Sequence, residues 1–390
     1  MKTRNLIIVS ICLSIASCTL KTDSESGFYY HPEVEIINSD LRFDDIIEDF
    51  KYIKLETNDS CLIGEVKQLL IHKSRIYVLS DGVFCFNMDG KFQFAISKEG
   101  RGPGEFLQIL NFGIDDDRLY LNSPRKILFY DSNSGEYLKS VDADYYIKYL
   151  CLDENSMYMD VLPIPQNKPD QTGRFFITQL NDQKMIEGVL PDIIDNFTAQ
   201  PFVTYNQCLY YSDPLLVQVY KTHNNAVVPY IHFQFGDKTP TTSDVENLLN
   251  MKPRTFNGYE KPYILENVFE TESAVTGAIR LNGRLLTIIF DKKSNKALAF
   301  DLLKSKEGER YEILGLKISA SYEDYFCSII TAPSLAGTAQ KLKDEVIGLD
   351  SSHPDISKIM PLLETELSDN PIIGMYKFKK PDEIKRRSGQ

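Results

Sequence analysis

The chain has 390 residues, of which 43% are hydrophobic and 25% are charged, and its formal net charge is −12. This acidic balance argues against nucleic acid as a partner, because phosphate backbones are bound by clustered Lys and Arg. After the N-terminal segment no apolar run is long enough to cross a bilayer, and the chain is long enough for one large core or two domains.

Residues 1–17 have the organisation of a secretory signal peptide, with a positive start at Lys2 and Arg4 and a short apolar run after it. The sequence IAS before Cys18 resembles the lipobox of bacterial lipoproteins, in which the cysteine is lipidated after cleavage. The resemblance implies lipidation at Cys18 and a lipid-anchored protein with membrane as a partner. The alternative is an ordinary secretory signal with a chance cysteine.

Residues 18–32 are small, polar and partly acidic, which predicts a flexible tether between the lipid and the folded domain. Asp23 and Glu25 follow closely after the cysteine and loosely resemble the surface-export signal of Bacteroidota lipoproteins. This resemblance implies the cell outer membrane as the location, with the domain either periplasmic or surface-exposed.

The domain at residues 33–380 shows an internal repeat of β-rich runs separated by polar turns. Six candidate copies begin at Arg75, Arg118, Ser156, Cys208, Leu285 and Asp324. The equivalent residues Tyr77 and Tyr120 are 43 positions apart. A repeat of about 40 residues with several hairpin-linked strands is typical of a propeller blade. The sequence therefore predicts an all-β fold, a six-bladed β-propeller of four-stranded antiparallel blades.

Three helical segments are expected, at residues 241–251, 332–346 and 353–367, and the last two predict a short helical insertion before the last strand. The apolar, β-rich run NPIIGMYKFK at 370–379 is expected to close the ring. Its partner strand is expected within residues 33–56, in EVEIIN or FKYIKLE, since pairing of the two ends removes free sheet edges. Residues 381–390 read as a polar C-terminal tail.

Three motifs carry a family resemblance: LETNDSCLIGEV, DGKFQFAISKEGRGPGEF and NPIIGMYKFK. They resemble the six-bladed β-propeller lipoproteins of Bacteroides and its relatives over nearly the whole mature chain. The blades are also similar to NHL and TolB-like repeats. The resemblance implies a propeller fold and a cell-envelope location, and it implies little about chemistry.

The loop EGRGPGEF at residues 99–106 is expected to connect two blades. No Gly-Lys-Ser/Thr follows it and it opens no helix, so it does not have the pattern of a phosphate-binding loop. As a tight corner it would use Arg101 and Glu105 to tie adjacent blades. As a binding site it would offer the Arg101 guanidinium to a carboxylate, a sulfate or sugar hydroxyls. The turns between middle strands, expected on the same rim, add the ligand-binding candidates Asp81, Asn122, Arg125 and Asp213, each alternatively a turn former.

Motifs of catalysis and metal binding are missing from the sequence. There is no H-E-x-x-H, G-x-S-x-G or C-x-x-C, and the five histidines have no ligand spacing, so we expect no metal and no cofactor. The stretch from Asp131 to Gly135 resembles a calcium loop superficially but lacks its remaining ligands, and it reads as a hairpin turn. The five cysteines after Cys18 read mainly as small buried hydrophobes, with one disulfide as the alternative.

These observations predict a binding or interaction module that presents its funnel or rim to a glycan, a peptide or an envelope protein. The alternatives are an extracellular hydrolase or lyase acting on a glycan or lactone at the funnel, and a purely structural role. Carboxylates with a histidine at the funnel floor would favour an enzyme, because propeller enzymes gather single residues from separate blades. A floor lined by aromatic or apolar groups would favour binding.

Overall fold

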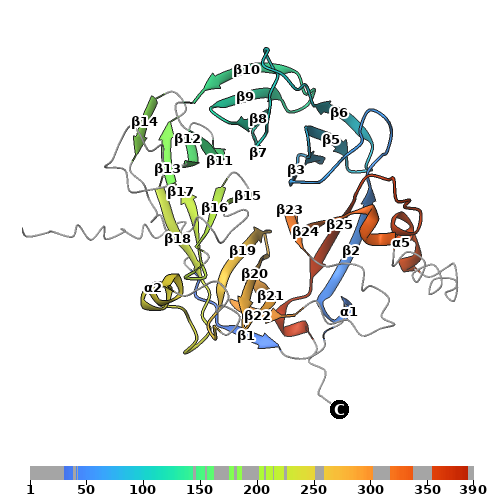
Figure 1. Ribbon diagram of the computed structural model, residues 1–390. Coiled ribbons are helices and arrows are strands. Elements are labelled where there is room, and N and C mark those ends of the chain that lie inside the picture. Colours follow the sequence, from blue (N-terminus) through green and yellow to red (C-terminus); the bar gives the residue numbers. More distant parts are fainter. Residues whose placement is uncertain are drawn as a thin grey trace, which may run out of the picture.

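Strands dominate the computed structural model, and its sheets stand in a ring around a common centre (Figure 1). The structure describes residues 30–37, 41, 43–143, 146–153, 156–161, 175–179, 182–186, 202–205, 208–213, 215–223, 226–250, 259–301, 317–336 and 354–384. The predicted signal peptide and Cys18 lie outside these residues, so the lipidation at Cys18 stays a prediction.

Four successive segments each form a four-stranded antiparallel sheet whose strands follow one another in sequence. They are β3 (Gln68–His72), β4 (Arg75–Leu79), β5 (Val83–Asn87) and β6 (Phe92–Ile96); β7 (Asn111–Asp115), β8 (Arg118–Ser123), β9 (Lys126–Asp131) and β10 (Tyr137–Asp142); β11 (Ile147–Asp153), β12 (Ser156–Val161), β13 (Phe175–Gln179) and β14 (Asp182–Ile186); and β15 (Phe202–Tyr205), β16 (Cys208–Asp213), β17 (Gln218–His223) and β18 (Ala226–His232). The first strand of each sheet lies nearest the centre and the fourth lies outside (Figure 1).

The sheet that closes the ring combines strands from both ends of the described chain. Its order is β2 (Ile47–Lys54), β25 (Ile372–Phe378), β24 (Tyr325–Ile330) and β23 (Ile318–Tyr322). Strand β2 pairs antiparallel with β25 along its whole length. The predicted pairing of residues 370–379 with an N-terminal strand is therefore confirmed, and FKYIKLE supplies that strand.

The remaining sheet has five strands. Its order is β1 (Val34–Ile37), β22 (Lys296–Phe300), β21 (Arg284–Asp291), β20 (Ala274–Leu281) and β19 (Tyr263–Glu270). Strand β1 pairs parallel with β22, whereas the other pairs are antiparallel. The predicted four-stranded antiparallel blade is therefore confirmed for the other described sheets and is wrong for this one. Among the described strands, five sheets have four strands each, and the EVEIIN segment adds a fifth strand here instead of closing the ring.

Residues 30–37, which we call the N-terminal strap, join the outer edges of two neighbouring sheets. The backbone N–H of Tyr30 donates to the Tyr230 carbonyl at 2.8 Å, and the N–H of Val34 donates to the Gln234 carbonyl at 2.8 Å. These bonds lie along and just beyond β18. The strap then continues as β1 along β22. Backbone pairing thus fastens the strap to two sheets in succession.

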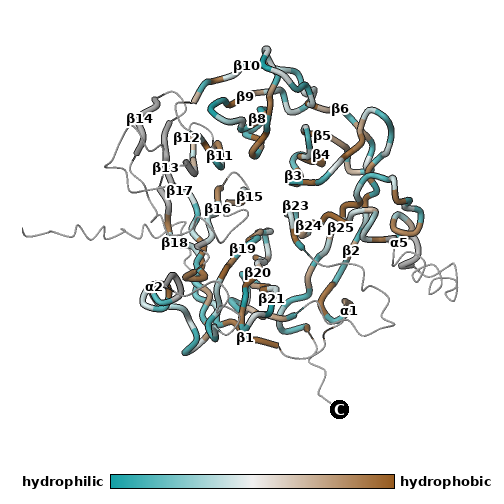
Figure 2. Tube along the Cα trace, in the orientation of Figure 1, coloured by the Kyte–Doolittle hydropathy of each residue, from teal (hydrophilic) through white to brown (hydrophobic). Residues whose placement is uncertain are grey.

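Apolar side chains fill the space between neighbouring sheets. Figure 2 shows hydrophobic residues along middle strands such as β4 and β8. Strand β4 is buried at four of its five positions and β8 at five of six. One cluster, which includes Tyr77, Leu121 and Tyr130, lies between the sheet β3–β6 and the sheet β7–β10. Because each sheet has a neighbour on either side, its middle strands are buried on both faces. Their sequences therefore read as continuous apolar runs.

Two amide side chains, which we call the amide clasps, join the inner strands of successive sheets. Gln68 Nε2 donates to the Phe112 carbonyl at 2.9 Å, and Gln68 Oε1 accepts from the Phe112 N–H at 3.1 Å. Asn111 repeats the arrangement one sheet later, with Nδ2 2.7 Å from the Leu150 carbonyl oxygen and Oδ1 3.0 Å from its N–H nitrogen. An innermost strand has no neighbouring strand on its central side, so each clasp satisfies backbone groups that would otherwise be unpaired.

The helices in the described residues are short: α1 (Phe43–Ile46), α2 (Thr242–Asn250), α3 (Ala332–Ala336), α5 (Pro354–Leu363) and a 3-10 helix (Pro381–Glu383). Helix α2 confirms the helix predicted at residues 241–251. Helices α3 and α5 follow β24 and precede β25, within the two other stretches predicted as helical. Residues 337–353 lie outside the described residues, so the predicted insertion is described only at these two helices.

Candidate functional site

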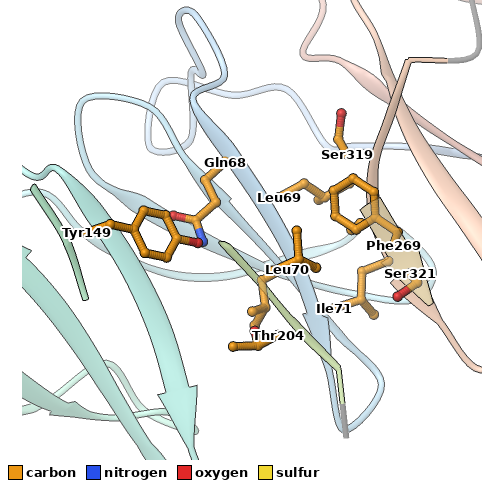
Figure 3. A pocket seen from close by; sticks show the side chains of 11 residues that line it. Gln68, Leu69, Leu70, Ile71, Tyr149, Thr204, Phe269, Ser319 and Ser321 are labelled. Carbon is orange, nitrogen blue, oxygen red and sulfur yellow. The ribbon is translucent and has the colours of Figure 1, made fainter. Parts of the chain in front are cut away.

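A cavity that is open to solvent lies among the inner strands of the ring, and its space, open solvent included, is about 380 Å³. Figure 3 shows the side chains that line it. Its walls come from the inner strands β3, β11, β15, β19 and β23. The lining consists of Gln68, Leu69, Leu70, Ile71, Tyr149, Val203, Thr204, Phe269, Ser319, Ala320 and Ser321. Among these described lining residues there is no Asp, Glu, His, Lys or Arg. The cavity therefore presents apolar, aromatic and uncharged polar groups.

Hydrogen bonding divides the polar lining groups into fixed and available ones. Gln68 is held in the clasp to Phe112, and Tyr149 Oη donates to the Phe202 carbonyl at 3.0 Å. The half-buried hydroxyls of Thr204 and Ser321 make no hydrogen bond within the described part of the chain. Each hydroxyl can donate one hydrogen bond and accept two, so both are available to a ligand.

Aromatic rings form two parts of the cavity wall. Tyr149 on β11 stacks on Phe202, with ring centroids 5.2 Å apart and an interplanar angle of 25°. Phe269 on β19 is only 4% exposed and lies on another wall (Figure 3). An aromatic and apolar concave surface with a few directed polar groups is typical of a small-molecule binding site.

The predicted rim residues Asp81 and Arg125 lie in exposed turns. Asp81 is in the turn between β4 and β5, with a side chain 95% exposed and its Oδ1 3.7 Å from Lys67 Nζ. Arg125 is exposed in the turn between β8 and β9, with φ 59°. Asp213 ends β16, where it pairs with Gln218 through the backbone, and its side chain lies outside what the structure describes.

Asn122 is inside strand β8 and has no exposed surface. Its Nδ2 donates to Asn111 Oδ1 at 2.9 Å and to the Ile147 carbonyl at 3.0 Å. From the sequence we expect Asn122 in the turn between two middle strands, where it could contact a ligand. In the structure this turn begins only after Ser123, so Asn122 lies within strand β8 and does not reach the rim. Asn122 instead supports the clasp between Asn111 and Leu150.

The loop 99–106 connects β6 to β7 and closes on itself. The Gly100 N–H donates to the Phe106 carbonyl at 3.1 Å, and Glu105 Oε2 accepts from the Gly102 N–H at 2.8 Å. The ring of Phe106 is buried in the cluster between the two sheets. The Glu105 carboxylate therefore stabilises the turn by accepting the Gly102 N–H.

Contacts across the loop show how it meets the next sheet. The Gly104 carbonyl accepts a hydrogen bond from Tyr130 Oη at 3.1 Å, and Gly104 has φ +70°. Arg101 is exposed and makes no hydrogen bond or ion pair within the described residues. The corner between sheets is therefore fixed by Gly104 and Tyr130, while the Arg101 guanidinium is accessible to a ligand or partner.

Among the described residues there is no group of three or more His, Cys, Asp or Glu that could hold a metal ion. Asp131 Oδ1 accepts from the N–H groups of Asn133 and Ser134, at 2.9 and 2.8 Å, so this stretch is the predicted hairpin turn. The described cysteines are free, with Cys208 half-buried and the rest buried. No described helix is long and apolar enough to cross a membrane.

Comparison with known proteins assigns a family. Residues 32–377 match the family described as Domain of unknown function (DUF4934). The chain belongs to this family. No curated protein matches the chain.

Among solved structures, a candidate exported protein from Bacteroides fragilis is 18% identical, with a TM-score of 0.71, over 89% of this chain and 99% of that one. This likeness shows a shared fold. The extracellular domain of a candidate one-component system from B. thetaiotaomicron is 13% identical, with a TM-score of 0.33, over 64% of this chain and 29% of that one. The S. cerevisiae complex of Dbp5 with Nup159 is 10% identical, with a TM-score of 0.37, over 70% of each chain.

Proposed function

We propose that this DUF4934 protein is a binding module whose central cavity takes a small polar ligand, such as a glycan unit or part of a peptide. The composition of the cavity lining carries the proposal. Aromatic and apolar walls surround the available hydroxyls of Thr204 and Ser321. A hydrolase or lyase needs a general acid or base within hydrogen-bond reach of its substrate, and the described lining offers no carboxylate or imidazole. The lining therefore favours binding over catalysis.

In this proposal the five-stranded sheet is the sixth blade of an NHL/TolB-like propeller, and β1 is an addition to it. The ring of sheets, five of which contribute an inner strand to the cavity wall, supports this interpretation. A rigid ring keeps the five walls of the cavity at fixed distances, which lowers the ordering cost of binding. The exposed residues Asp81, Arg101 and Arg125 would meet a second part of the ligand or an envelope protein.

We further propose that the protein is exported and anchored to the outer membrane through lipid on Cys18, facing the periplasm or the cell surface. The signal-peptide pattern and the lipobox-like sequence before Cys18 support this location. The similar Bacteroides fragilis protein is itself a candidate exported protein, which agrees with this location.

A thermal-shift screen against neutral oligosaccharides and short peptides tests the cavity as a binding site. A ligand that binds only the folded state at about 100 times its Kd stabilises the protein by about 2.7 kcal/mol. The double variant Thr204→Val, Ser321→Ala keeps the shape of the wall and removes both hydroxyls. We expect it to lose affinity about tenfold, while Ser319→Ala, whose hydroxyl is bonded to the Lys317 carbonyl, has a smaller effect.

The opposite pattern would place the ligand elsewhere. A ligand whose affinity is unchanged in the double variant and lost in Arg101→Ala binds at the rim and not in the cavity.

A further inference from the structure

Strand β19 is distorted where it borders the cavity. Its pairing with β20 shifts register between Tyr263 and Glu266 and again between Glu266 and Phe269. Ile264 and Asn267 adopt φ values of 55° and 52°, in the left-handed region. A β-branched residue rarely adopts this conformation, and such strain is concentrated at functional sites. Glu266 lies between the two strained residues.

The register places Glu266 and Arg280 on the same face of the sheet. Glu266 pairs with Ala278, and Arg280 is two residues further along the regularly paired strand β20. Phe269 on this face packs with Ile318 and other residues of the ring-closing sheet. Glu266 and Arg280 therefore face that sheet.

The exposed Lys317 acts on Glu266 from the neighbouring sheet through its charge. It immediately precedes β23, the inner strand of the ring-closing sheet, which lies against β19. Its near neighbour Ser319 lines the cavity, as does Phe269 on β19. The charges of Arg280 and Lys317 thus both act on the Glu266 carboxyl group, close in sequence to the cavity-lining residues Phe269 and Ser319.

These three charged side chains lack direct partners. Within the described part of the chain, Glu266, Arg280 and Lys317 make no side-chain hydrogen bond or ion pair. Glu270, on the same strand, differs because Lys292 Nζ lies 2.7 Å from its Oε1. Burial raises the pKa of Glu266, although the charges of Arg280 and Lys317 act in the opposite direction. The two cations therefore provide an excess of positive charge around a carboxyl group that is poorly solvated.

We propose that Arg280 and Lys317 bind an anionic group of the cavity ligand, and that Glu266 takes up a proton when this anion binds. The inference rests on the cavity being the ligand site. Two unpaired cations recognise a carboxylate or sulfate, and the neutral hydroxyls in the cavity recognise a polyol. The ligand class that combines both groups is an acidic sugar derivative.

Proton uptake follows from the charges that act on Glu266. These are Arg280 from β20 and Lys317 from the segment before β23, and Arg280 also acts on Tyr263 of β19. A bound anion raises the pKa of Glu266, because it opposes the ionised carboxylate. The complex therefore binds more protons than the free protein, and affinity increases as pH falls.

Calorimetric titration with sodium D-glucuronate and with D-glucose, which differ in the carboxylate, tests the inference between about pH 5.5 and pH 8. We expect glucuronate to bind at least about tenfold more tightly than glucose at the lower pH, with proton uptake. Arg280→Gln should remove this preference and leave glucose binding unchanged. Glu266→Gln should bind glucuronate more tightly at pH 8 and with little pH dependence. Lys296→Gln, which alters an exposed pair with Asp382, is the matched control and should change nothing.

The outcomes separate this inference from the proposed function. Glucuronate that binds no better than glucose, or binds equally well to Arg280→Gln, overturns the anion site. If both sugars also lose affinity in the Thr204→Val, Ser321→Ala variant, the cavity remains the binding site. If glucuronate depends on Arg280 but not on that double variant, the anion site holds and the cavity proposal fails. Absence of binding by both sugars at millimolar concentration overturns the acidic-sugar assignment.

Discussion

Replacement of Asn111 by Leu tests how strongly an amide clasp holds two blades together. Asn111 is 2% exposed, and its amide bonds both backbone groups of Leu150 and the Nδ2 of Asn122. Leu has a similar size but bonds none of them. A buried polar group left without a partner costs about 1–3 kcal/mol, so the two groups of Leu150 predict a loss of about 2–6 kcal/mol. Native domains are stable by only about 5–15 kcal/mol, so the effect is large.

Urea unfolding followed by tyrosine fluorescence measures this loss, since the chain has 22 tyrosines and no tryptophan. Gln68→Leu is the matched control. Gln68 makes the same two bonds to Phe112 but is half-buried at the cavity, where water can replace its amide. We expect Gln68→Leu to cost less than about 2 kcal/mol. Equal costs for the two variants, or a cost below about 1 kcal/mol for Asn111→Leu, would refute the reasoning.

Four further predictions concern the pairing of β2 with β25, the loop at residues 99–106, lipidation at Cys18 and metal binding. Deletion of residues 370–390 removes β25 and exposes β2 and β24, so the protein should aggregate in size-exclusion chromatography; a soluble product that melts cooperatively would show that another strand closes the ring. Gly104→Ala should lower the melting temperature more than Gly236→Ala. Both glycines have positive φ, so both variants are strained in the backbone. They differ because a Cβ at Gly104 would lie 2.9 Å from the Tyr137 ring, whereas a Cβ at Gly236 meets open space. Equal shifts would mean that the ring moves aside at little cost. Cys18→Ser should abolish labelling with a radioactive fatty acid, and persistent labelling would contradict the lipoprotein prediction. Chelator should leave the melting temperature unchanged, and a fall that calcium or zinc reverses would reveal a metal site.

The blade repeat was predictable because its signals are local. The copies predicted from Arg75, Arg118 and Cys208 begin at the second strands β4, β8 and β16 of their sheets. Each contains β-rich runs and polar turns that are close in sequence. The copy at Leu285 falls instead on a third strand, β21, because the three strands β19, β20 and β21 have eight residues each and lengthen the spacing.

The candidate site was harder to predict because its contacts join distant parts of the chain. Gln68 bonds a residue 44 positions away and Asn111 a residue 39 positions away. Both are polar residues at the start of apolar inner strands, and this shared position is the one signal that the sequence offers. The segment YILENVFE shows no sign of the two register shifts around Glu266, because bulges depend on the partner strand.

If the protein is anchored through Cys18 as proposed, the strap has a mechanical consequence. Tension on the tether reaches residue 30 first and loads the backbone bonds from the strap to the chain at 230–234, then those to β22. The pairing of β2 with β25 lies further along the chain. It bears tension only after the strap has separated from both sheets. In the proposed anchored protein, the strap would therefore carry a pulling force before the ring does, so that the lipid anchor could be pulled without opening the ring.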